Sequence, residues 1–466
     1  MAFREKLKPL LSDIRFWIVL FFLVRLIGIT NPPLETTHNW RQCLTNMIAR
    51  NFGETELNLL YPRIDMAGNQ TGIIGSEFPF YNFLIYIFNT VFGYSHWYGR
   101  LINLFVSSLG IYFFSEVVKK IAGQRVAFFA SFIFLFSIWF AYSRKIMPDT
   151  FSVSLVITGF WFLCRYAEKQ HLVNLFFYFL FCALGMLCKI PALSMVAVSG
   201  VLIFAQQLNA AAKAAILLAT AASVAVAGLW YFLWVPHLLE TYHYQLYWTN
   251  SFAEGIGEIL PVLPQYFQRF YFSAFHSFIA FACCLAGVFY IFKNEGFLLK
   301  CGLAVITAAF ISFTIITGYT FVFHGYYIIP FVPVMAFAAG YAVSRMPARF
   351  AFIPVLLIAG ESVANQYHDF FIREKEQYKL SLEKIMDTQV PENKLIIING
   401  GKSPQEMYFA HRKGWTVDNE AVTVQELEKL KALGAAYLVI NIKTFAGIDY
   451  YPLMYSDEHY AVYKLN

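Results

Sequence analysis

Charged side chains are scarce in this sequence. Of its 466 residues only 14% are Asp, Glu, Lys or Arg, whereas 58% are hydrophobic, and the mean hydropathy is +0.53. A soluble domain carries about 25% charged residues, and its core cannot take up this much apolar surface. The composition therefore excludes an ordinary soluble protein and predicts that lipid surrounds most of the chain. The net charge is +6. In a membrane protein the positions of the basic residues indicate topology, so this charge does not predict a nucleic-acid partner.

Cysteines and phosphate-binding motifs are also few. None of the seven cysteines forms a CxxC pair, and only Cys43 is expected outside the membrane, so no disulfide framework is predicted. The sequence GGKS at 400–403 follows a predicted strand, but a phosphate loop needs glycine where Ile396 stands, which argues against a nucleotide site. The basic N-terminus lacks a small-residue cleavage pattern, so the first apolar run is predicted to be an uncleaved span.

Long apolar runs dominate instead, many of them near the roughly 20 residues that cross a bilayer. They predict about eleven transmembrane helices, at 16–30, 97–118, 123–143, 149–167, 172–188, 190–207, 212–234, 270–292, 299–320, 326–343 and 349–364. Basic residues fall mostly on alternate links, which predicts a cytoplasmic N-terminus and an outer C-terminal segment. The apolar segment 79–93 is predicted to lie on the outer surface, because a span there would place the later basic links outside.

Two domains are predicted. A transmembrane domain at 1–364 contains a large first outer loop at 31–96, and a small α/β domain on the outer face occupies 365–466. In the second domain KLIIING, AAYLVINI and YAVYKLN are typical of strands, while PQEMYFAHRKG and TVQELEKLKALG are typical of amphipathic helices. This domain shows no constellation of catalytic groups, so an accessory role is predicted.

The first outer loop is rich in ionisable residues among aromatic ones. It holds Glu35, His38, Arg41, Asp65 and Glu77. One interpretation is a solvated loop whose arginines meet lipid headgroups. The other is a reaction site at the membrane surface, where a carboxylate or histidine acts as a base or holds a metal and arginines bind a phosphate.

Several short motifs in order carry a resemblance to a known family. They are SEFPFYNFLIYIFNTVFGYSHWYGRLINLF at 76–105, FAYSRKIMPDTFSVSLVITGFWFLCRYAEK at 140–169, LGMLCKIPAL at 184–193 and FHGYYIIPFVPVMAFAAG at 323–340. The chain resembles the GT-C type membrane glycosyltransferases, and within them the bacterial branch of lipid A aminoarabinose transferase and the protein O-mannosyltransferases. A subset with an HxWRQ sequence is similar through His38, Trp40, Arg41 and Gln42.

The resemblance implies an activity and a location. Proteins of this kind transfer a sugar, with inversion, from a polyprenyl-phosphate donor to a lipid, glycan or protein acceptor on the periplasmic face of the bacterial inner membrane. The multi-pass body would supply an apolar groove for the polyprenyl tail. The cytoplasmic N-terminus and the periplasmic C-terminal domain expected from the basic links agree with this location.

The resemblance also implies the base. Glu77 lies where relatives carry an acidic residue before a proline, so we expect it to be the principal base or metal-holding acid, supported by His38. The acidic pair that many relatives carry earlier in the loop is replaced by Arg41 and Gln42, and the subset's Asp is replaced by Leu44. Asp65, Glu35 and His38 therefore stay open as alternatives. A divalent metal on Glu77 and His38 also stays open, since no ligand spacing demands it.

The donor phosphate needs cations and hydrogen-bond donors at the interface. Residues expected near the outer ends of spans, and so facing this phosphate, are Arg41, Arg144, Lys145, Lys189, His324 and Tyr327, with Trp40, Gln42 and Asp149 in support. Simpler explanations exist: a helix cap for Asp149, a snorkelling side chain for Lys189, and an aromatic belt around His324.

Two alternatives to an active enzyme remain open at this stage. A transporter or lipid flippase would also have many spans, but charged or proline-broken segments deep in the helices and an internal repeat would be expected. The sequence shows neither. A catalytically inactive lipid-binding relative is the other alternative, and the missing acidic pair favours it.

Overall fold

The computed structural model describes residues 11–244 and 250–465. The chain divides into two compact units. One, the helical unit, comprises residues 1–29, 100–233 and 247–370, and the other, the mixed unit, comprises 30–99, 234–246 and 371–466. The first outer loop thus belongs to the same unit as the C-terminal segment, whereas the sequence alone suggested a division near residue 364.

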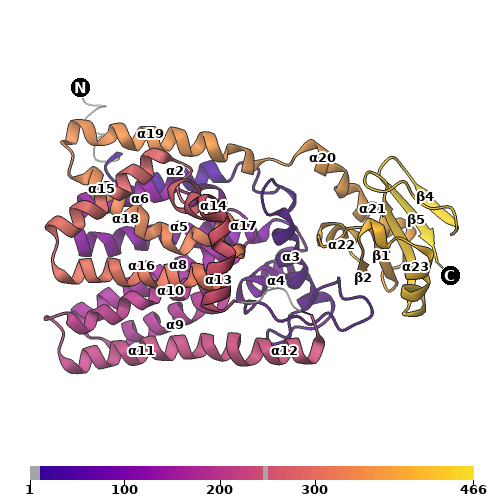
Figure 1. Ribbon diagram of the computed structural model, residues 1–466, viewed down its shortest axis with the longest axis horizontal. Helices are drawn as coiled ribbons and strands as arrows, with labels where there is room; N and C mark the ends of the chain where they lie inside the picture. The colour runs from indigo at the N-terminus through magenta and orange to yellow at the C-terminus, as the bar shows by residue number, and fades with distance from the viewer. Residues whose placement is uncertain (1–10, 245–249, 466) are drawn as a thin grey trace. The chain divides into compact units, whose positions relative to one another are not determined.

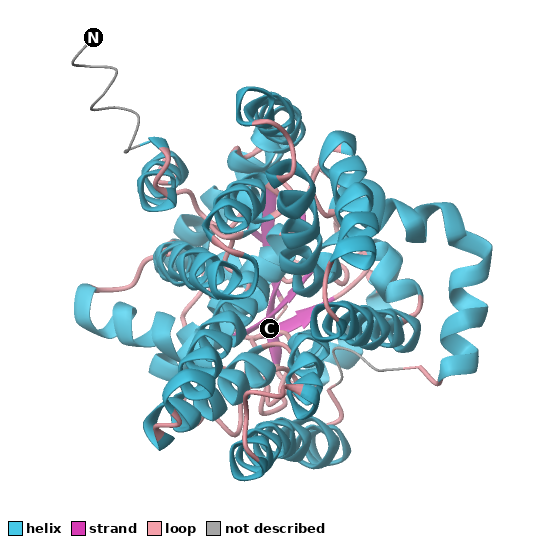
Figure 2. Ribbon diagram, turned by 90° about the vertical axis from the view of Figure 1, so that its left-hand side faces the viewer, coloured by secondary structure: helices cyan, strands magenta, loops and turns pink. Residues whose placement is uncertain are grey.

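The helical unit is a bundle of helices that lie side by side along its length (Figure 1) and are seen end-on in Figure 2. Its main helices are α2 (Ile14–Arg25), α5 (Tyr98–Ala122), α6 (Gln124–Phe136), α8 (Pro148–Lys169), α9 (Leu172–Cys188), α11 (Ala210–Leu229), α15 (Phe278–Asn294), α16 (Phe297–Thr317), α18 (Val332–Ser344) and α19 (Ala348–Gln366). Shorter pieces are α7 (Trp139–Tyr142), η1 (Ile190–Ala192), α10 (Leu193–Val196), η2 (Ala197–Phe204), η3 (Trp230–Trp234), α13 (Phe252–Ile259), η4 (Leu260–Val262), α14 (Leu263–Gln268), η5 (Arg269–Ser273), α17 (Tyr319–Phe323), η6 (Gly325–Phe331) and η7 (Tyr367–Phe370).

The prediction of a multi-pass helical membrane protein is confirmed. Within residues 11–244 and 250–465, six helices are long and apolar enough to cross a membrane, and a bent pair would make a seventh span. Other apolar helices, including α6 and α9, are shorter. The count of about eleven spans stays a prediction.

The bent pair differs from the single span predicted at 270–292. Residues Phe252–Ser273 and α15 meet at 89°. The break has a local cause, since His276 has a positive φ of 51° and the Ser277 side chain accepts a hydrogen bond from the Ala280 N–H at the start of α15. The straight helix therefore begins at Phe278.

Glycines bring the helix backbones of the bundle close together. A Cβ placed on Gly287 of α15 would lie 1.7 Å from the carbonyl oxygen of Ala338 in α18. One placed on Gly340 of α18 would lie 2.3 Å from the backbone nitrogen of Ala130 in α6. Such small-residue contacts are how helices pack in lipid, where burying apolar side chains adds little.

The mixed unit contains a five-stranded sheet of order β2-β1-β3-β5-β4. Its strands are β1 (Leu395–Ile398), β2 (Gly414–Thr416), β3 (Ala435–Asn441), β4 (Leu453–Ser456) and β5 (Tyr460–Lys464). β1 pairs in parallel with β2 and β3, whereas β5 pairs antiparallel with β3 and β4. The other elements are α3 (Asn39–Glu54), α4 (Phe80–Phe92), α12 (Val235–Tyr242), α20 (Glu374–Gln377), η8 (Tyr378–Leu380), α21 (Ser381–Gln389), α22 (Gln405–Ala410), η9 (Asn419–Ala421) and α23 (Val424–Ala432).

The small α/β fold predicted for the C-terminal segment is confirmed. All three predicted strands and both predicted helices are present, although the helix predicted to continue through HRKG ends at Ala410. His411 has a positive φ of 49°, and β2 then begins at Gly414. Alternate residues of the strands lie on opposite faces of the sheet and belong to different hydrophobic clusters. Ile396 packs with α21 and α22, whereas Ile397 packs with α23.

The first outer loop and the C-terminal segment share one hydrophobic core. Buried residues of α3 such as Leu44 and Met47 belong to the same cluster as Met407 and Phe409 of α22 and strand residue Val439. Removing the C-terminal segment would expose the apolar face of α3, because the two share this core. The accessory role predicted for the C-terminal domain stays a prediction.

Candidate active site

Arg41 and Glu77, the two loop residues predicted to carry the chemistry, form an ion pair in the mixed unit. The Arg41 Nη2 lies 2.7 Å from Glu77 Oε1, and only 9% and 15% of the two side chains is exposed. Arg41 projects from the first turn of α3, whereas Glu77 precedes α4 by a short turn. Shielding from water strengthens this pair relative to one on the surface. The structure thus joins the predicted base and a residue predicted to meet the phosphate.

The backbone before α3 is strained. Thr37 and His38 have φ values of 68° and 57°, in the left-handed region that favours glycine. For a β-branched residue such as Thr37 this conformation is an outlier, and such strain collects at functional sites. His38 is the N-terminal flanking residue of α3, and Trp40, Arg41 and Gln42 follow it in the helix. The strained residues therefore lie at the start of the HxWRQ segment that the sequence analysis singled out. The strain itself could not be predicted from the sequence.

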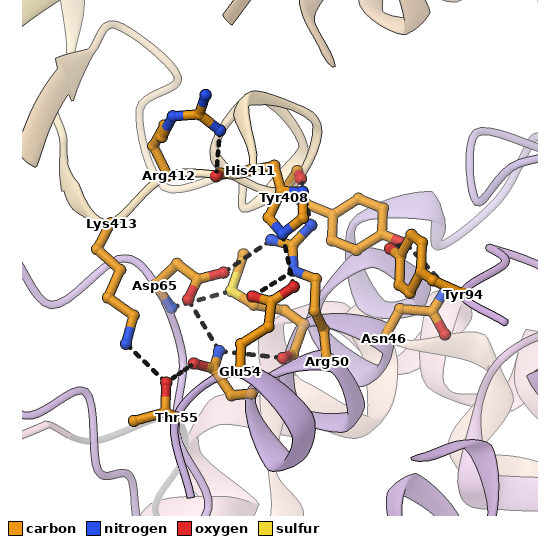
Figure 3. Close-up of polar contacts among 12 residues, drawn as sticks. Asn46, Arg50, Glu54, Thr55, Asp65, Tyr94, Tyr408, His411, Arg412 and Lys413 are labelled. Atoms are coloured by element: carbon orange, nitrogen blue, oxygen red, sulfur yellow. Dashed lines mark hydrogen bonds and ion pairs between the residues drawn. The ribbon is translucent and has the colours of Figure 1, made fainter. Parts of the chain in front are cut away.

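Asp65 lies in a different arrangement, shown in Figure 3. Its Oδ2 lies 2.9 Å from Arg50 Nη2, and its Oδ1 accepts a hydrogen bond of 2.8 Å from Asn51. Asp65 is 4% exposed and Arg50 3%. Burial alone would lower the pKa of Arg50, but Asp65 and the other acidic groups around it raise this pKa above its ordinary value. This geometry is that of a structural ion pair.

Further contacts in Figure 3 join α3 to the C-terminal segment. The Arg50 guanidinium donates to the Tyr408 carbonyl oxygen at 3.1 Å and lies 4.9 Å from the Tyr408 ring centre. Glu54 meets His411 at 2.6 Å. Burial opposes ionisation of Glu54, but the His411 hydrogen bond and the Arg50 charge lower its pKa below the usual range. Glu35 is buried elsewhere in the unit and accepts a hydrogen bond from Asn31 at 3.0 Å.

In the helical unit, Lys189 lies among acidic and aromatic groups. Its Nζ is 4.0 Å from Asp149 Oδ1 and 5.8 Å and 5.4 Å from the ring centres of Tyr326 and Tyr327. The His324 ring centre lies 6.0 Å from that of Tyr327. Lys189 is the C-terminal flanking residue of α9, and Asp149 occupies the first turn of α8. The extended backbone at Lys189 ends α9, and η1 begins at the next residue.

Arg144 belongs to the same unit but makes other contacts. Its Nη2 donates to the Gly28 carbonyl oxygen at 2.8 Å, and its guanidinium carbon lies 4.3 Å from the Phe370 ring centre. Lys145 next to it lies 5.7 Å from the Tyr142 ring centre. A carbonyl oxygen and aromatic rings thus surround these two cations.

Two residues near this cluster were not assigned to the site from the sequence. Tyr326 is 2% exposed and faces Lys189, and only its place in the HGYY motif could have drawn attention to it. Arg269 donates from Nε to the Val322 carbonyl oxygen at 2.8 Å, just before His324. No sequence pattern indicated Arg269, which lies immediately before the predicted span 270–292.

The described residues offer no ready ligand set for a divalent metal. Within 11–244 and 250–465 no group of three or more His, Cys, Asp and Glu side chains could hold a metal ion. Glu77, one of the two residues considered for that role, faces the Arg41 guanidinium instead.

Comparisons with known proteins place this arrangement in a fold class. Residues 76–234 match the family model described as dolichyl-phosphate-mannose-protein mannosyltransferase. The chain is similar to ArnT from Cupriavidus metallidurans in the apo state, with a TM-score of 0.67, 13% identity, and 96% of this chain and 97% of that chain covered. It is equally similar to ArnT bound to undecaprenyl phosphate, with a TM-score of 0.66, 14% identity, and coverage of 96% and 98%.

A second kind of solved structure matches with lower coverage. The archaeal oligosaccharyltransferase AglB from Archaeoglobus fulgidus, in complex with an inhibitory peptide and a dolichol-phosphate, has a TM-score of 0.63 and 12% identity, with 92% of this chain and 70% of that chain covered. The search of curated proteins finds no match. The fold is therefore that of the GT-C glycosyltransferases, and the resemblance read from the sequence is confirmed. Membership of the HxWRQ subset stays a prediction.

Proposed function

We propose that this chain is a membrane glycosyltransferase that transfers a sugar from a polyprenyl-phosphate donor to an acceptor on the outer face of the membrane. The observation that carries the proposal is the fold shared over 96% of the chain with an ArnT structure that holds undecaprenyl phosphate. The family match to dolichyl-phosphate-mannose-protein mannosyltransferases points to the same class of donor. The acceptor is a lipid, a glycan or a protein.

Glu77 acts as the base in this proposal. The acceptor hydroxyl oxygen attacks the anomeric carbon from the side opposite the phosphate, and its proton passes to Glu77. The new carbon–oxygen bond forms as the bond from the anomeric carbon to the phosphate oxygen breaks. Polyprenyl phosphate leaves with the bonding electrons, and the configuration at the anomeric carbon is inverted.

Arg41 supports Glu77 in two ways. An opposite charge at 2.7 Å favours the ionised carboxylate, which is the form that a base needs. The contact also fixes the carboxylate orientation, and correct orientation is a large part of catalysis. His38, in its strained backbone beside Arg41, is assigned a supporting role. Asp65 and Glu35 are assigned structural roles because both are buried in contacts with neighbouring side chains.

Lys189 binds the donor phosphate in this proposal. Its ammonium group lies 4.0 Å from Asp149 Oδ1, so a carboxylate favours its charged form at this site. The Tyr326 and Tyr327 rings hold the ammonium in place. A positive charge held in advance stabilises the negative charge that the leaving phosphate gains. Arg144 and His324 are assigned to the same task.

Binding of undecaprenyl phosphate to the purified full chain tests this proposal, with native mass spectrometry as the readout. We expect a one-to-one complex, which Lys189→Ala weakens roughly tenfold or more, because a hydrogen bond to a charged group contributes about 1.5–3 kcal/mol. Lys169→Ala, at an exposed lysine of the same unit, is the matched control and should bind as wild type. Absence of binding by the wild-type chain, or equal binding by Lys189→Ala, would contradict the proposal.

A further inference from the structure

A polar crevice in the mixed unit lies outside the residues assigned above. It has a volume of about 310 Å³ and is lined by residues that follow three strands of the sheet. Asn399 and Gly400 follow β1, Asp418 follows β2, and Asn441 ends β3. Sites for small ligands typically begin at about 300 Å³. The crevice is therefore large enough for a single small polar molecule.

The sheet topology puts the crevice where such sheets bind ligands. The chain passes from β1 to β2 on one side, and β3 then pairs with the other side of β1. All three strands are parallel, so their carboxyl ends share one edge. In open α/β sheets ligands bind outside the carboxyl ends of the strands, at the point where the strand order reverses. The crevice between the ends of β1 and β3 is that point.

The floor of the crevice is a rigid network of amides. The Asn441 N–H donates to Asn399 Oδ1 at 2.6 Å, and Asn399 Nδ2 donates to Asn419 Oδ1 at 2.9 Å. Asn399 and Asn441 are 6% and 2% exposed. Because these groups bond to one another, they set the shape of the crevice and hold its walls in fixed positions.

The walls present acceptors to a ligand. Among the residues that the structure describes, none donates a hydrogen bond to the Asp418 carboxylate or to Glu406 Oε2. Asp418 Oδ1 lies 2.9 Å from where a Cβ on Gly401 would stand, and Gly401 has a positive φ of 59°, so only glycine lets this carboxylate approach the turn. Glu406 is 6% exposed.

Lys379, the cation in the lining of the crevice, is already bound by neighbouring side chains. Lys379 Nζ donates to Glu376 at 2.6 Å and to Gln405 at 2.5 Å, and lies 3.5 Å from Glu406 Oε1. Glu420 adds a further carboxylate to the lining. The electrostatic balance thus disfavours phosphates and nucleotides, in agreement with the incomplete GGKS motif, and favours a ligand that donates several hydrogen bonds.

We propose that this crevice binds a sugar through its hydroxyl groups, with Asp418 and Glu406 as acceptors. Carboxylates accept two or more hydroxyl hydrogen bonds each, and the amide floor supplies mixed donors and acceptors. A sugar with an amino group satisfies the same acceptors. The site does not depend on the proposed sugar transfer, because none of its residues takes part in that chemistry.

Saturation-transfer NMR on the purified full chain tests this site. The probes are glucose, mannose, galactose, arabinose and glucosamine, with inorganic phosphate as a separate arm. We expect saturable binding of at least one sugar and none of phosphate, and a roughly tenfold or greater loss of sugar affinity in Asp418→Ala and Asp418→Asn. Asp449→Ala, at an exposed aspartate outside the crevice, is the matched control.

Glu77→Gln separates this site from the proposed active site, and it should leave crevice binding unchanged. The proposal is overturned if no sugar binds saturably, if phosphate binds in place of a sugar, or if both Asp418 variants bind as wild type. It is also overturned if Glu77→Gln alone abolishes the binding, since the sugar would then occupy the site of transfer.

Discussion

At the scale of single residues, Arg41 and Glu77 act as one unit. Because their side chains meet at 2.7 Å and are mostly buried, a change in either alters the surroundings of the other. Removing only one partner of a shielded pair leaves an uncompensated charge, which costs more than removing both. The roles of the two residues therefore have to be measured together.

The first prediction concerns this pair. Glu77→Gln should lower the transfer rate by about 10² to 10⁴, as expected for loss of a general base. Arg41→Ala should also lower it, because the carboxylate loses its partner and orientation. In a double-mutant cycle on the rate of transfer, the combined variant should lose far less than the product of the two single losses. Fully multiplicative losses would show that the residues act independently.

The second prediction separates Asp65 from Glu77. Asp65→Ala removes the partner of buried Arg50, and breaking such a pair costs about 3–5 kcal/mol. We expect a large fall in thermal stability and in the yield of folded protein, measured by size-exclusion chromatography in detergent. Glu77→Gln should be destabilised less, because the side chains of Arg41 and Glu77 are 9% and 15% exposed whereas those of Arg50 and Asp65 are 1% and 4% exposed. A stable Asp65→Ala protein that binds undecaprenyl phosphate but transfers no sugar would identify Asp65 as the base.

The sequence predicted which residues carry charge near the site, but it did not predict the partner of each charged side chain. Glu77, Arg41 and Lys189 were predicted as site residues from a motif and from charge near expected span ends, and their roles stay predictions. Nothing in the sequence indicated that Arg41 pairs with Glu77, or that Asp65 pairs with Arg50. These pairings depend on how α3 packs against the segments after it, and only a tertiary structure supplies that packing.

At the scale of elements, hydrophobic pattern predicted most of what the structure contains. The buried strands β1 and β3 are apolar runs and were found from the sequence. β2 was missed because it has three residues and comes directly after a helical pattern. β4 was missed because it is a largely exposed strand at the sheet edge. The broken span before α15 was also missed, since hydropathy alone does not register the bend at His276.

The third prediction concerns the glycine contacts between helices. Gly287→Ala should reduce the yield of folded protein strongly, because the added Cβ would lie 1.7 Å from the Ala338 carbonyl oxygen and α15 would have to move away from α18. The measurement is the monodisperse fraction after detergent extraction. Gly360→Ala in α19 is the control: its Cβ meets nothing within 4 Å, and alanine favours a helix over glycine. Equal yields of the two variants would argue against the close packing.

At the scale of the whole molecule, the division into units does not follow the order of the chain. The first outer loop and the C-terminal segment are far apart in sequence, yet they build one unit with a common core. The hydrophobic pattern of each segment could be recognised in the sequence. That the two segments pack against each other could not, because an apolar face does not indicate which other face it contacts.

The fourth prediction follows from this shared core. A chain ending at residue 370 should leave the apolar face of α3 exposed, so that residues 30–99 become sensitive to limited proteolysis while the helical unit stays intact. Undecaprenyl phosphate should still bind through Lys189, but transfer should be lost along with the position of Glu77. A truncated chain with a protease-resistant loop and normal transfer would show that the C-terminal segment is accessory after all.

The most direct test of the central claim is consumption of the donor in cells. Polyprenyl phosphates that carry a single sugar can be quantified by mass spectrometry of lipid extracts from cells producing either the wild-type chain or Glu77→Gln at equal levels. We predict that one such lipid accumulates with Glu77→Gln and falls to a low level with the wild type, because only the wild type transfers its sugar. Identical lipid profiles in the two strains would contradict the assignment of this protein as a glycosyltransferase with Glu77 as its base.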